Sequence, residues 1–271
     1  MRTSEWIVLA YAGYLIAVSI VRPVGRARRA GVIGGGVALA ALVAAVAWVP
    51  ATPLAQVVRN FAPLAWIFAS YRLSGLLFVA PQPGVEAGFA RFDARVQRAL
   101  GMPGSVERAP RLLLEFLEFS YVFCYPALPA GLIALIASGR GGDADRYWSF
   151  VELATLACYG MVPWIRTRAP WALEPPGPMD RRAVLVRKIN RLVIRSASIT
   201  VNTFPSAHAA SVLAAALAVV TVAPAAGGAL LIVAAGIVAA TFVGRYHYAG
   251  DSPAAVVTTL VVWAAVSLVQ W

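Results

Sequence analysis

Long apolar runs that almost lack charged side chains follow one another along this 271-residue chain. A helix of about 20 residues crosses the roughly 30 Å hydrocarbon layer of a bilayer, and several runs reach that length. Within a run the apolar residues are continuous and do not alternate with polar ones, which argues against a transmembrane β-barrel. The sequence therefore predicts an all-α fold, a polytopic transmembrane helical bundle.

We predict about eight spans, separated by segments that hold most of the charged residues. The spans lie near residues 5–21, 31–49, 62–80, 112–137, 147–164, 205–223, 226–243 and 252–270. We expect residues 1–60 to hold two N-terminal spans. We expect residues 61–271 to form a six-span core with long interfacial loops at 81–111 and 165–204.

The composition fits a membrane protein and narrows its partners. Hydrophobic residues make up 60% of the chain and charged residues 13%, whereas about a quarter of a soluble domain is charged. The net charge of +11 comes almost entirely from arginine, so we expect contact with anionic lipid headgroups. The sequence has neither zinc-ligand spacing nor an aromatic–basic platform, so we expect no nucleic-acid partner. Beyond the two motif histidines, no carboxylates or histidines cluster at ligand spacing, so we expect no metal and no cofactor.

Both long loops contain a stretch with the spacing of an amphipathic helix. In the first loop, arginines are interleaved with the apolar residues Phe89, Phe92, Val96 and Leu100. In the second loop, a basic stretch contains the apolar face Leu185, Ile189, Leu192 and Val193. Such helices lie in the membrane interface with the apolar face in the bilayer, and we expect both stretches to do so.

The only two histidines of the chain lie in short polar motifs at the ends of apolar runs. One motif is Phe204-Pro205-Ser206-Ala207-His208, and the other is Arg245-Tyr246-His247-Tyr248-Ala249-Gly250-Asp251. Two predicted spans separate the motifs, so both lie on the same side of the membrane. The topology therefore allows the two motifs to share one site.

His247 and Asp251 are four residues apart, a spacing that places two side chains on one face of a helix. A carboxylate bonded to one imidazole nitrogen fixes the tautomer and leaves the other nitrogen free to attack. Asp251 is also a suitable N-cap, because Ser252 and Pro253 follow it. The pair is thus a candidate nucleophile with its orienting group, or a helix cap beside a histidine, and the two roles are compatible.

Ser206, Ala207 and His208 begin a predicted span directly after a proline. A helix N-terminus offers unpaired N–H groups and the positive end of the helix dipole to a phosphate. Ser206 can donate to a phosphate oxygen, and His208 can protonate a leaving oxygen. The alternative is a capped helix with an interfacial histidine.

Three arginines beside the predicted spans are candidate phosphate ligands. Arg166 and Arg168 follow the fifth span directly, and Arg245 lies two residues before His247. Guanidinium groups bind phosphate oxygens in fork geometry and stay charged at any working pH. Arginines in such positions are equally typical of topology signals.

The order FPSAH, two apolar helices and then RYHYAGD resembles the type 2 phosphatidic acid phosphatase superfamily. Its integral-membrane lipid phosphatases share a helical fold with the vanadium haloperoxidases. The resemblance implies that His247 is a nucleophile that forms a phosphohistidine, with Asp251 as its orienting group and His208 as the general acid. It also implies that Ser206, the neighbouring N–H groups and Arg168 bind the phosphate.

The chain departs from the family pattern at three positions, and the resemblance covers roughly the six-span core. Ala207 replaces a glycine of the second motif. The lysine of the first motif has no counterpart, because Met161 lies seven residues before Arg168. The arginine of the third motif precedes the histidine by six residues, where this chain has Thr241, so Arg245 would act from a different position.

Lys188 and Arg195 also have the lysine–arginine spacing of the first motif. Ser196 stands where the family has proline, and the gap to the second motif is short. We therefore prefer Arg168 as the arginine of the first motif, with Arg166 as the alternative.

The favoured hypothesis is a metal-independent phosphatase of the cell membrane that hydrolyses a lipid phosphate or lipid pyrophosphate through phospho-His247. One alternative is a lipid phosphotransferase that resembles the inositol-phosphorylceramide and sphingomyelin synthases and passes the phospho-group to an alcohol. Another is a lipid-binding or transport protein on the same fold that has lost the chemistry. The sequence leaves open the oligomeric state. It also leaves open the side of the membrane on which the active site lies, because the positive-inside rule favours the cytoplasm whereas the resemblance implies the opposite side.

Two oppositely charged residues fall inside predicted spans. Arg72 lies in the third span and Glu118 in the fourth. At about 1.5 Å per residue they lie at similar depths, and an isolated charge at the centre of a span costs about 2.5–3.5 kcal/mol. We therefore predict an Arg72–Glu118 ion pair.

Overall fold

The computed structural model describes residues 1–50, 52–102, 104–175, 177–182 and 184–268, and it contains helices but no β-strand within them. Five of the described helices are long and apolar enough to cross a membrane. These helices are α1 (Thr3–Val21), α2 (Arg26–Trp48), α7 (Arg111–Ala137), α12 (Pro224–Val243) and α13 (Asp251–Leu268). The all-α prediction is confirmed, and the five candidate spans indicate a membrane protein.

Three shorter helices occupy the positions of the other predicted spans. They are α4 (Pro63–Leu76), α8 (Ala144–Gly160) and α11 (Ala207–Val220). The third and fifth predicted spans, 62–80 and 147–164, run past the ends of α4 and α8. For α8 the reason is Pro163, which cannot continue a helix. Residues 269 and 270 of the last predicted span lie outside the described residues.

The main hydrophobic core surrounds α11, which packs against α7, α8, α12 and α13. Its small side chains Ala210, Ala214, Ala215 and Ala216 are fully buried. Small residues allow neighbouring helices to approach closely. The first turn of α11, which carries His208, is therefore held between its neighbours.

A second hydrophobic cluster joins α1, α2 and α4. Asp145 of α8 caps α1, because its carboxylate accepts the N–H groups of Thr3 and Ser4 at 2.9 Å each. A carboxylate at a helix N-terminus also interacts favourably with the helix dipole. The domain boundary predicted at residue 60 falls near the end of a short helix, α3 (Pro53–Phe61), that directly precedes α4.

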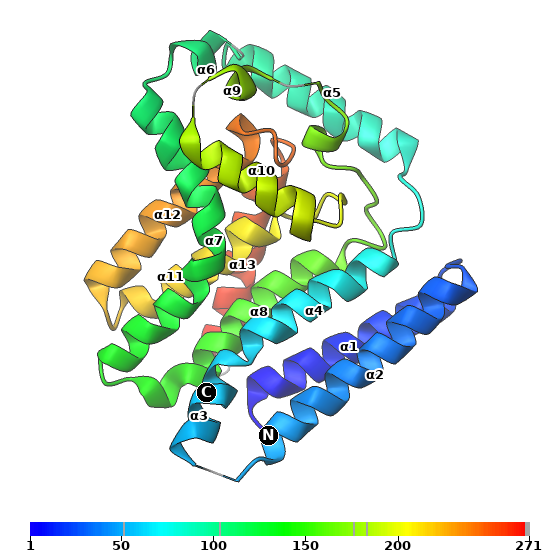
Figure 1. Cartoon of the computed structure of the whole chain (residues 1–271), viewed down its shortest axis with the longest axis vertical. Coiled ribbons are helices and arrows are strands. Elements are labelled where there is room, and N and C mark those ends of the chain that lie inside the picture. Colours follow the sequence, from blue (N-terminus) through cyan, green and yellow to red (C-terminus); the bar gives the residue numbers. More distant parts are fainter. Residues whose placement is uncertain (51, 103, 176, 183, 269–271) are drawn as a thin grey trace.

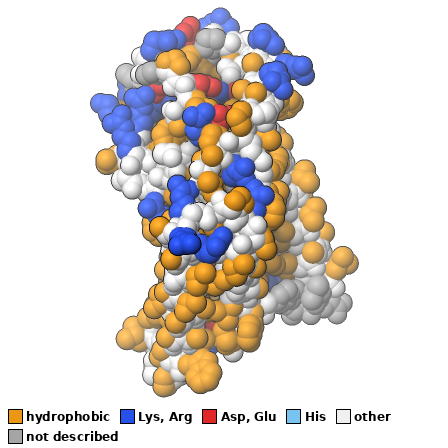
Figure 2. Space-filling model, turned by 90° about the vertical axis from the view of Figure 1, so that its right-hand side faces the viewer, with side chains coloured by type: hydrophobic (Ala, Val, Ile, Leu, Met, Phe, Trp, Pro, Cys, Tyr) orange, Lys and Arg blue, Asp and Glu red, His pale blue; other side chains and the backbone are white. Residues whose placement is uncertain are grey.

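Short helices gather at one end of the bundle (Figure 1). They are α5 (Pro83–Ala99), α6 (Gly104–Arg108), α9 (Pro178–Arg181) and α10 (Leu185–Ala197). Figure 2 shows Lys and Arg side chains around this end, while hydrophobic side chains dominate the opposite end. This distribution matches the loop charges expected for a membrane protein.

The two amphipathic stretches are both helical, and most of their predicted apolar faces are exposed, with Phe89 as an exception. Leu185, Ile189 and Leu192 of α10 are exposed, in agreement with an interfacial helix. Phe89 of α5 instead packs against the rings of Phe204 and Tyr248, with centroid distances of 5.0 and 5.5 Å. Phe89 therefore covers the loops that carry the two motifs, whereas Phe92 and Leu100 of the same predicted face are exposed, as expected for an interfacial helix.

The predicted Arg72–Glu118 ion pair was wrong. Arg72 is exposed and donates to the carbonyl oxygen of Ala197 at 3.3 Å. Glu118 pairs with Arg187 of α10, and the Nη1–Oε1 distance is 2.7 Å. The predicted partner was wrong because the helix that packs against this side of α7 is α10.

Candidate active site

The two histidines lie at the same end of the bundle and face one another. His208 is in the first turn of α11, and His247 is in the connection between α12 and α13. Their ring centroids are 6.0 Å apart. The N–H of Ser206 donates to the carbonyl oxygen of Asp251 at 3.0 Å, so the two motifs are also joined through the backbone. The structure thus brings the two polar motifs together.

Asp251 orients His247. Its Oδ2 lies 3.1 Å from His247 Nδ1 and also accepts the N–H of Tyr248 at 3.1 Å. Asp251 is fully buried at the start of α13. An Nδ1–H that donates to a carboxylate leaves Nε2 of the neutral ring as an unprotonated nitrogen. No hydrogen bond engages Nε2 within the described part of the chain.

His208 lies between two tyrosines of α7. The Tyr125 hydroxyl is 3.5 Å from His208 Nε2, and the ring centroid of Tyr121 is 5.1 Å from that of His208. The tyrosines are four residues apart, so one face of α7 presents both rings. This spacing is visible in the sequence, but only the packing of α7 on α11 shows that it concerns His208.

Buried polar atoms without a partner concentrate at the two motifs. Among the described residues ten such side-chain atoms occur. Five of them are Asn202 Oδ1, Ser206 Oγ, His208 Nδ1, Arg245 Nη1 and Asp251 Oδ1. Buried polar groups in native proteins are normally hydrogen-bonded, and exceptions are often functional. The cluster is therefore suited to a polar ligand.

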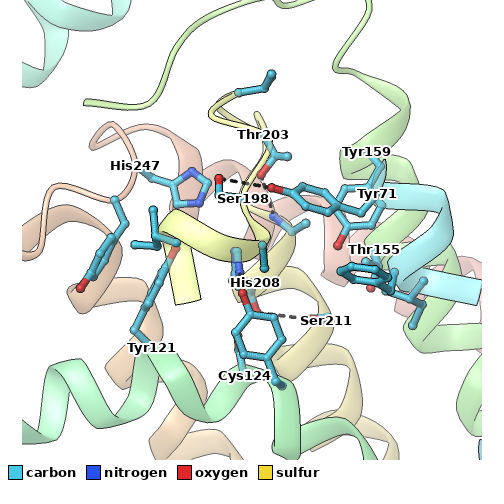
Figure 3. A pocket seen from close by; sticks show the side chains of 18 of the residues that line it. Tyr71, Tyr121, Cys124, Thr155, Tyr159, Ser198, Thr203, His208, Ser211 and His247 are labelled. Atoms are coloured by element: carbon cyan, nitrogen blue, oxygen red, sulfur yellow. Dashed lines mark hydrogen bonds between the residues drawn. The ribbon is translucent and has the colours of Figure 1, made fainter. Parts of the chain in front are cut away.

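A cavity of about 300 Å³ adjoins the histidines. Figure 3 shows the two histidines on one side of it and Tyr71 with Tyr159 on the other. Its walls are mainly apolar and aromatic side chains of α4, α7 and α8, among them Leu64, Ile67, Tyr71, Cys124, Leu128 and Tyr159. Phe68 and Tyr125 also line it and are 55% and 50% exposed, so the cavity reaches the side of the bundle. An apolar cleft with a few convergent polar groups is typical of a ligand site.

Arg168 lies outside the lining of this cavity. Its guanidinium binds Glu86 through two hydrogen bonds, Nη2–Oε1 at 2.7 Å and Nε–Oε2 at 3.2 Å. The side-chain bond from Arg168 is the main cause that lowers the pKa of Glu86. The fork of Arg168 is thus occupied by a carboxylate in this structure.

Arg245 and Arg166 also lie outside the lining of the cavity. Arg245 binds Glu174 with Nε and Nη2, and Nη2 is 2.7 Å from Asp93 Oδ2. Burial opposes the charge of Arg245, but the bonds to Glu174 and Asp93 outweigh it and raise its pKa. Arg166 donates to the carbonyl oxygens of Ala80 and Pro163 at 2.9 and 3.2 Å. The structure therefore groups Ser206, Ala207, His208, His247 and Asp251, and it places the three arginines outside the cavity, in contact with other segments.

A buried network behind Tyr246 did not follow from the sequence. The Tyr246 ring stacks on Tyr121 with a centroid distance of 3.9 Å and an interplanar angle of 11°. Its hydroxyl donates to Glu118 Oε2 at 2.5 Å, and Glu118 also binds Arg187 and Asn190. Tyr246 directly precedes His247, so the network supports the backbone of the candidate nucleophile.

A metal-ion site is not evident in the described part of the chain, because no group of three or more His, Cys, Asp or Glu residues there could hold one.

Comparisons with models of known families, with curated proteins and with solved structures find no match to this chain.

Proposed function

We propose that this protein is a membrane phosphatase that hydrolyses a lipid phosphate or lipid pyrophosphate through a phosphohistidine at His247. The observation that carries the proposal is the arrangement of His247, oriented by Asp251, opposite His208 across 6.0 Å between ring centroids. The adjoining apolar cavity offers a place for the lipid tail. The motif resemblance supports membership in the type 2 phosphatidic acid phosphatase superfamily.

The first step transfers the phosphoryl group to His247. Nε2 attacks phosphorus, an Nε2–P bond forms, and the P–O bond to the lipid breaks. His208 gives a proton to the leaving oxygen, so that the lipid alcohol departs neutral. In a near-attack arrangement His247 Nε2 lies about 3–3.5 Å from phosphorus, while His208 lies within hydrogen-bond distance of the leaving oxygen.

The second step releases phosphate. A water molecule attacks phosphorus, the Nε2–P bond breaks, and His208 accepts the proton of the water. Inorganic phosphate leaves, and both histidines return to their initial protonation states. Asp251 holds the His247 ring in the same orientation through both steps and stabilises its positive charge.

The N-terminus of α11 is the proposed cradle for the non-bridging phosphate oxygens. In the part of the chain that the structure describes, Ser206 Oγ has no hydrogen-bond partner, and the N–H of Ala207 has only a 3.5 Å contact with Thr203 Oγ1. Helix N-termini bind phosphate through such N–H groups. We propose that Arg168 joins them when the phosphate replaces Glu86 at its guanidinium, since both are oxyanions that match the fork.

The lipid tail would occupy the cavity between α4 and α7. Its exposed rim residues Phe68 and Tyr125 lie on the side of the bundle, where hydrocarbon would surround them. In this proposal α4, α8 and α11 complete eight spans of a cell-membrane protein. A tail could then reach the histidines from the bilayer without crossing water.

Phosphate release by detergent-purified protein in EDTA tests the proposal. The substrates are a panel of lipid phosphates and pyrophosphates, and the proteins are wild type, His247→Asn and the control Arg140→Gln. Arg140 is an exposed arginine in the connection between α7 and α8. We expect chelator-resistant release from wild type and the control but none from folded His247→Asn.

A folded wild type that releases no phosphate contradicts hydrolysis. Addition of inositol or diacylglycerol then tests the phosphotransferase alternative, since an alcohol would replace water in the second step. Absence of transfer as well would leave a lipid-binding protein.

A further inference from the structure

A second cavity, of about 330 Å³, adjoins the first near the histidines. Trp171, Ile194 and Tyr246 line both cavities, so their side chains form the wall between the two. The lining of the second cavity is strongly charged. Its charged residues are Glu174, Asp180, Arg187, Arg191, Arg195 and Arg245.

Three of these arginines form a row on α10. Arg187, Arg191 and Arg195 follow at four-residue spacing and share one face of the helix. Asp180 Oδ1 lies 2.6 Å from both Arg187 Nε and Arg191 Nη2, which holds the first two in place. Arg195 is exposed and has no ion-pair partner within the described residues. The row therefore ends in a cation that is available to a ligand.

Arg245 contributes the second available donor. Glu174 occupies its Nε–Nη2 edge, and Asp93 occupies the other side of Nη2. Its Nη1 is buried and has no hydrogen-bond partner among the described residues. A buried charged donor without an acceptor is unfavourable, so an anion at Nη1 would stabilise this arrangement.

We propose that the second cavity binds a phosphate group, separate from the one that reacts between the histidines. Each carboxylate of its lining is already held by an arginine, which leaves Arg195 and Arg245 Nη1 to bind the ligand. Guanidinium groups match the oxygens of phosphate in both charge and geometry. Among the described residues no arginine lines the first cavity, so the second is the cationic one of the pair.

Two sources can supply this phosphate. One is inorganic phosphate, which would bind in the second cavity after hydrolysis. This role rests on the proposed function. The other is the headgroup of a neighbouring anionic lipid. Binding itself requires only the cavity and its arginines.

Calorimetric titration of inorganic phosphate into the full-length His247→Asn protein in neutral detergent tests the binding without turnover. We expect saturable phosphate binding. Adding Arg195→Gln to the same protein should raise the Kd about tenfold or more, because a charge-assisted hydrogen bond is lost. Arg191→Gln with Arg195→Gln should weaken it further. Arg140→Gln, which removes an exposed arginine elsewhere, should leave it unchanged. Circular dichroism and size exclusion verify folding, and Arg195 suits the test because it holds no ion pair.

The same titration in phosphatidylcholine nanodiscs, with and without phosphatidylglycerol, separates the sources. If the headgroup is the natural occupant, phosphatidylglycerol lowers the apparent affinity for inorganic phosphate, and the Arg195→Gln protein loses this competition. Equal affinities in both discs assign the cavity to free phosphate. Absence of binding, or equal binding with and without the two arginines, overturns the proposal. Phosphate release by wild type is measured separately, so failure of the proposed function is recognised independently.

Discussion

Arg187 Nη1 donates to Glu118 Oε1 at 2.7 Å, and the two side chains are 9% and 1% exposed. Asn190 and Tyr246 donate to the other carboxylate oxygen of Glu118, at 2.7 and 2.5 Å. The ion pair thus joins α7, α10 and the segment that leads to His247. It also lies next to the wall between the two cavities, which includes Tyr246.

Removal of one member of this pair should destabilise the protein strongly. Arg187→Leu leaves the buried carboxylate of Glu118 without an ionic partner, a change that costs about 3–5 kcal/mol. Glu118→Leu should cost less, because Arg187 keeps its ion pair with Asp180. The double substitution should cost less than the sum of the two, because no lone charge remains. Thermal unfolding of the four proteins in detergent measures this coupling. Arg72→Leu is the control with little expected effect, since Arg72 is exposed, and additive losses for the pair would contradict the prediction.

The sequence located this charge but not its partner. Residue spacing along a helix indicates depth, and it placed Glu118 correctly within the first turns of its span. It does not indicate which neighbouring helix lies against that side. Arg187 belongs to an amphipathic stretch that was expected at the membrane surface, and the packing of α10 on α7 brings its guanidinium to Glu118.

The candidate site, too, could be predicted from the sequence only in part. His208, His247 and Asp251 could be found because short motifs and an even number of intervening spans are properties of the sequence. The carboxylates that hold Arg168 and Arg245 could not, since Glu86 and Glu174 come from distant segments. Only the folded arrangement of the loops shows that both guanidinium groups already have partners.

Asp251→Asn should remove most of the activity while the fold persists. An amide can donate where the carboxylate accepts, which favours the wrong tautomer of His247; in a comparable triad this change lowers kcat about 10⁴-fold. We expect a loss of about 10²–10⁴-fold in kcat with a smaller change in KM. Steady-state phosphate release checks this, with Asp143→Asn, directly before α8, as the control. A loss confined to KM would assign Asp251 to substrate binding.

Cys124→Phe should narrow the proposed tail cavity. Cys124 lines the cavity from α7, so the larger ring can occupy existing space. We expect kcat/KM to fall about tenfold or more for long-chain lipid phosphates, the scale of a few lost methylene contacts. Short-chain substrates should be affected less. Ile133→Phe, on an exposed face of α7, is the control, and an equal loss for all chain lengths would argue against a tail site.

Glu86→Gln should favour substrate binding if Arg168 contacts phosphate. The pair between the exposed Arg168 and Glu86 competes with the substrate, and solvent-screened pairs of this kind contribute little. Its removal should therefore lower KM by up to about fivefold, whereas Arg168→Gln should raise KM. Glu107→Gln, which breaks another exposed pair, with Arg181, is the control. A higher KM in Glu86→Gln would show that the carboxylate positions Arg168 instead of competing for it.

Asp180 should make the stability of the α9–α10 region depend on acidic pH. Burial opposes the ionisation of Asp180, but its bonds with Arg187, the Gly177 N–H and the charge of Arg191 outweigh burial and lower its pKa. The unfolded chain therefore takes up the proton first, near the ordinary aspartate pKa of about 3.9. The contribution of Asp180 to the free energy of unfolding is complete above that pH and is lost as the pH falls through the lower folded value.

Wild type should accordingly have a higher Tm than Asp180→Asn at neutral pH, and the difference should shrink below about pH 4. Differential scanning fluorimetry over this range measures the difference, with Asp143→Asn as the control at the other end of the bundle. A Tm difference that stays constant to the acid limit would mean that the charge of Asp180 does not stabilise this region.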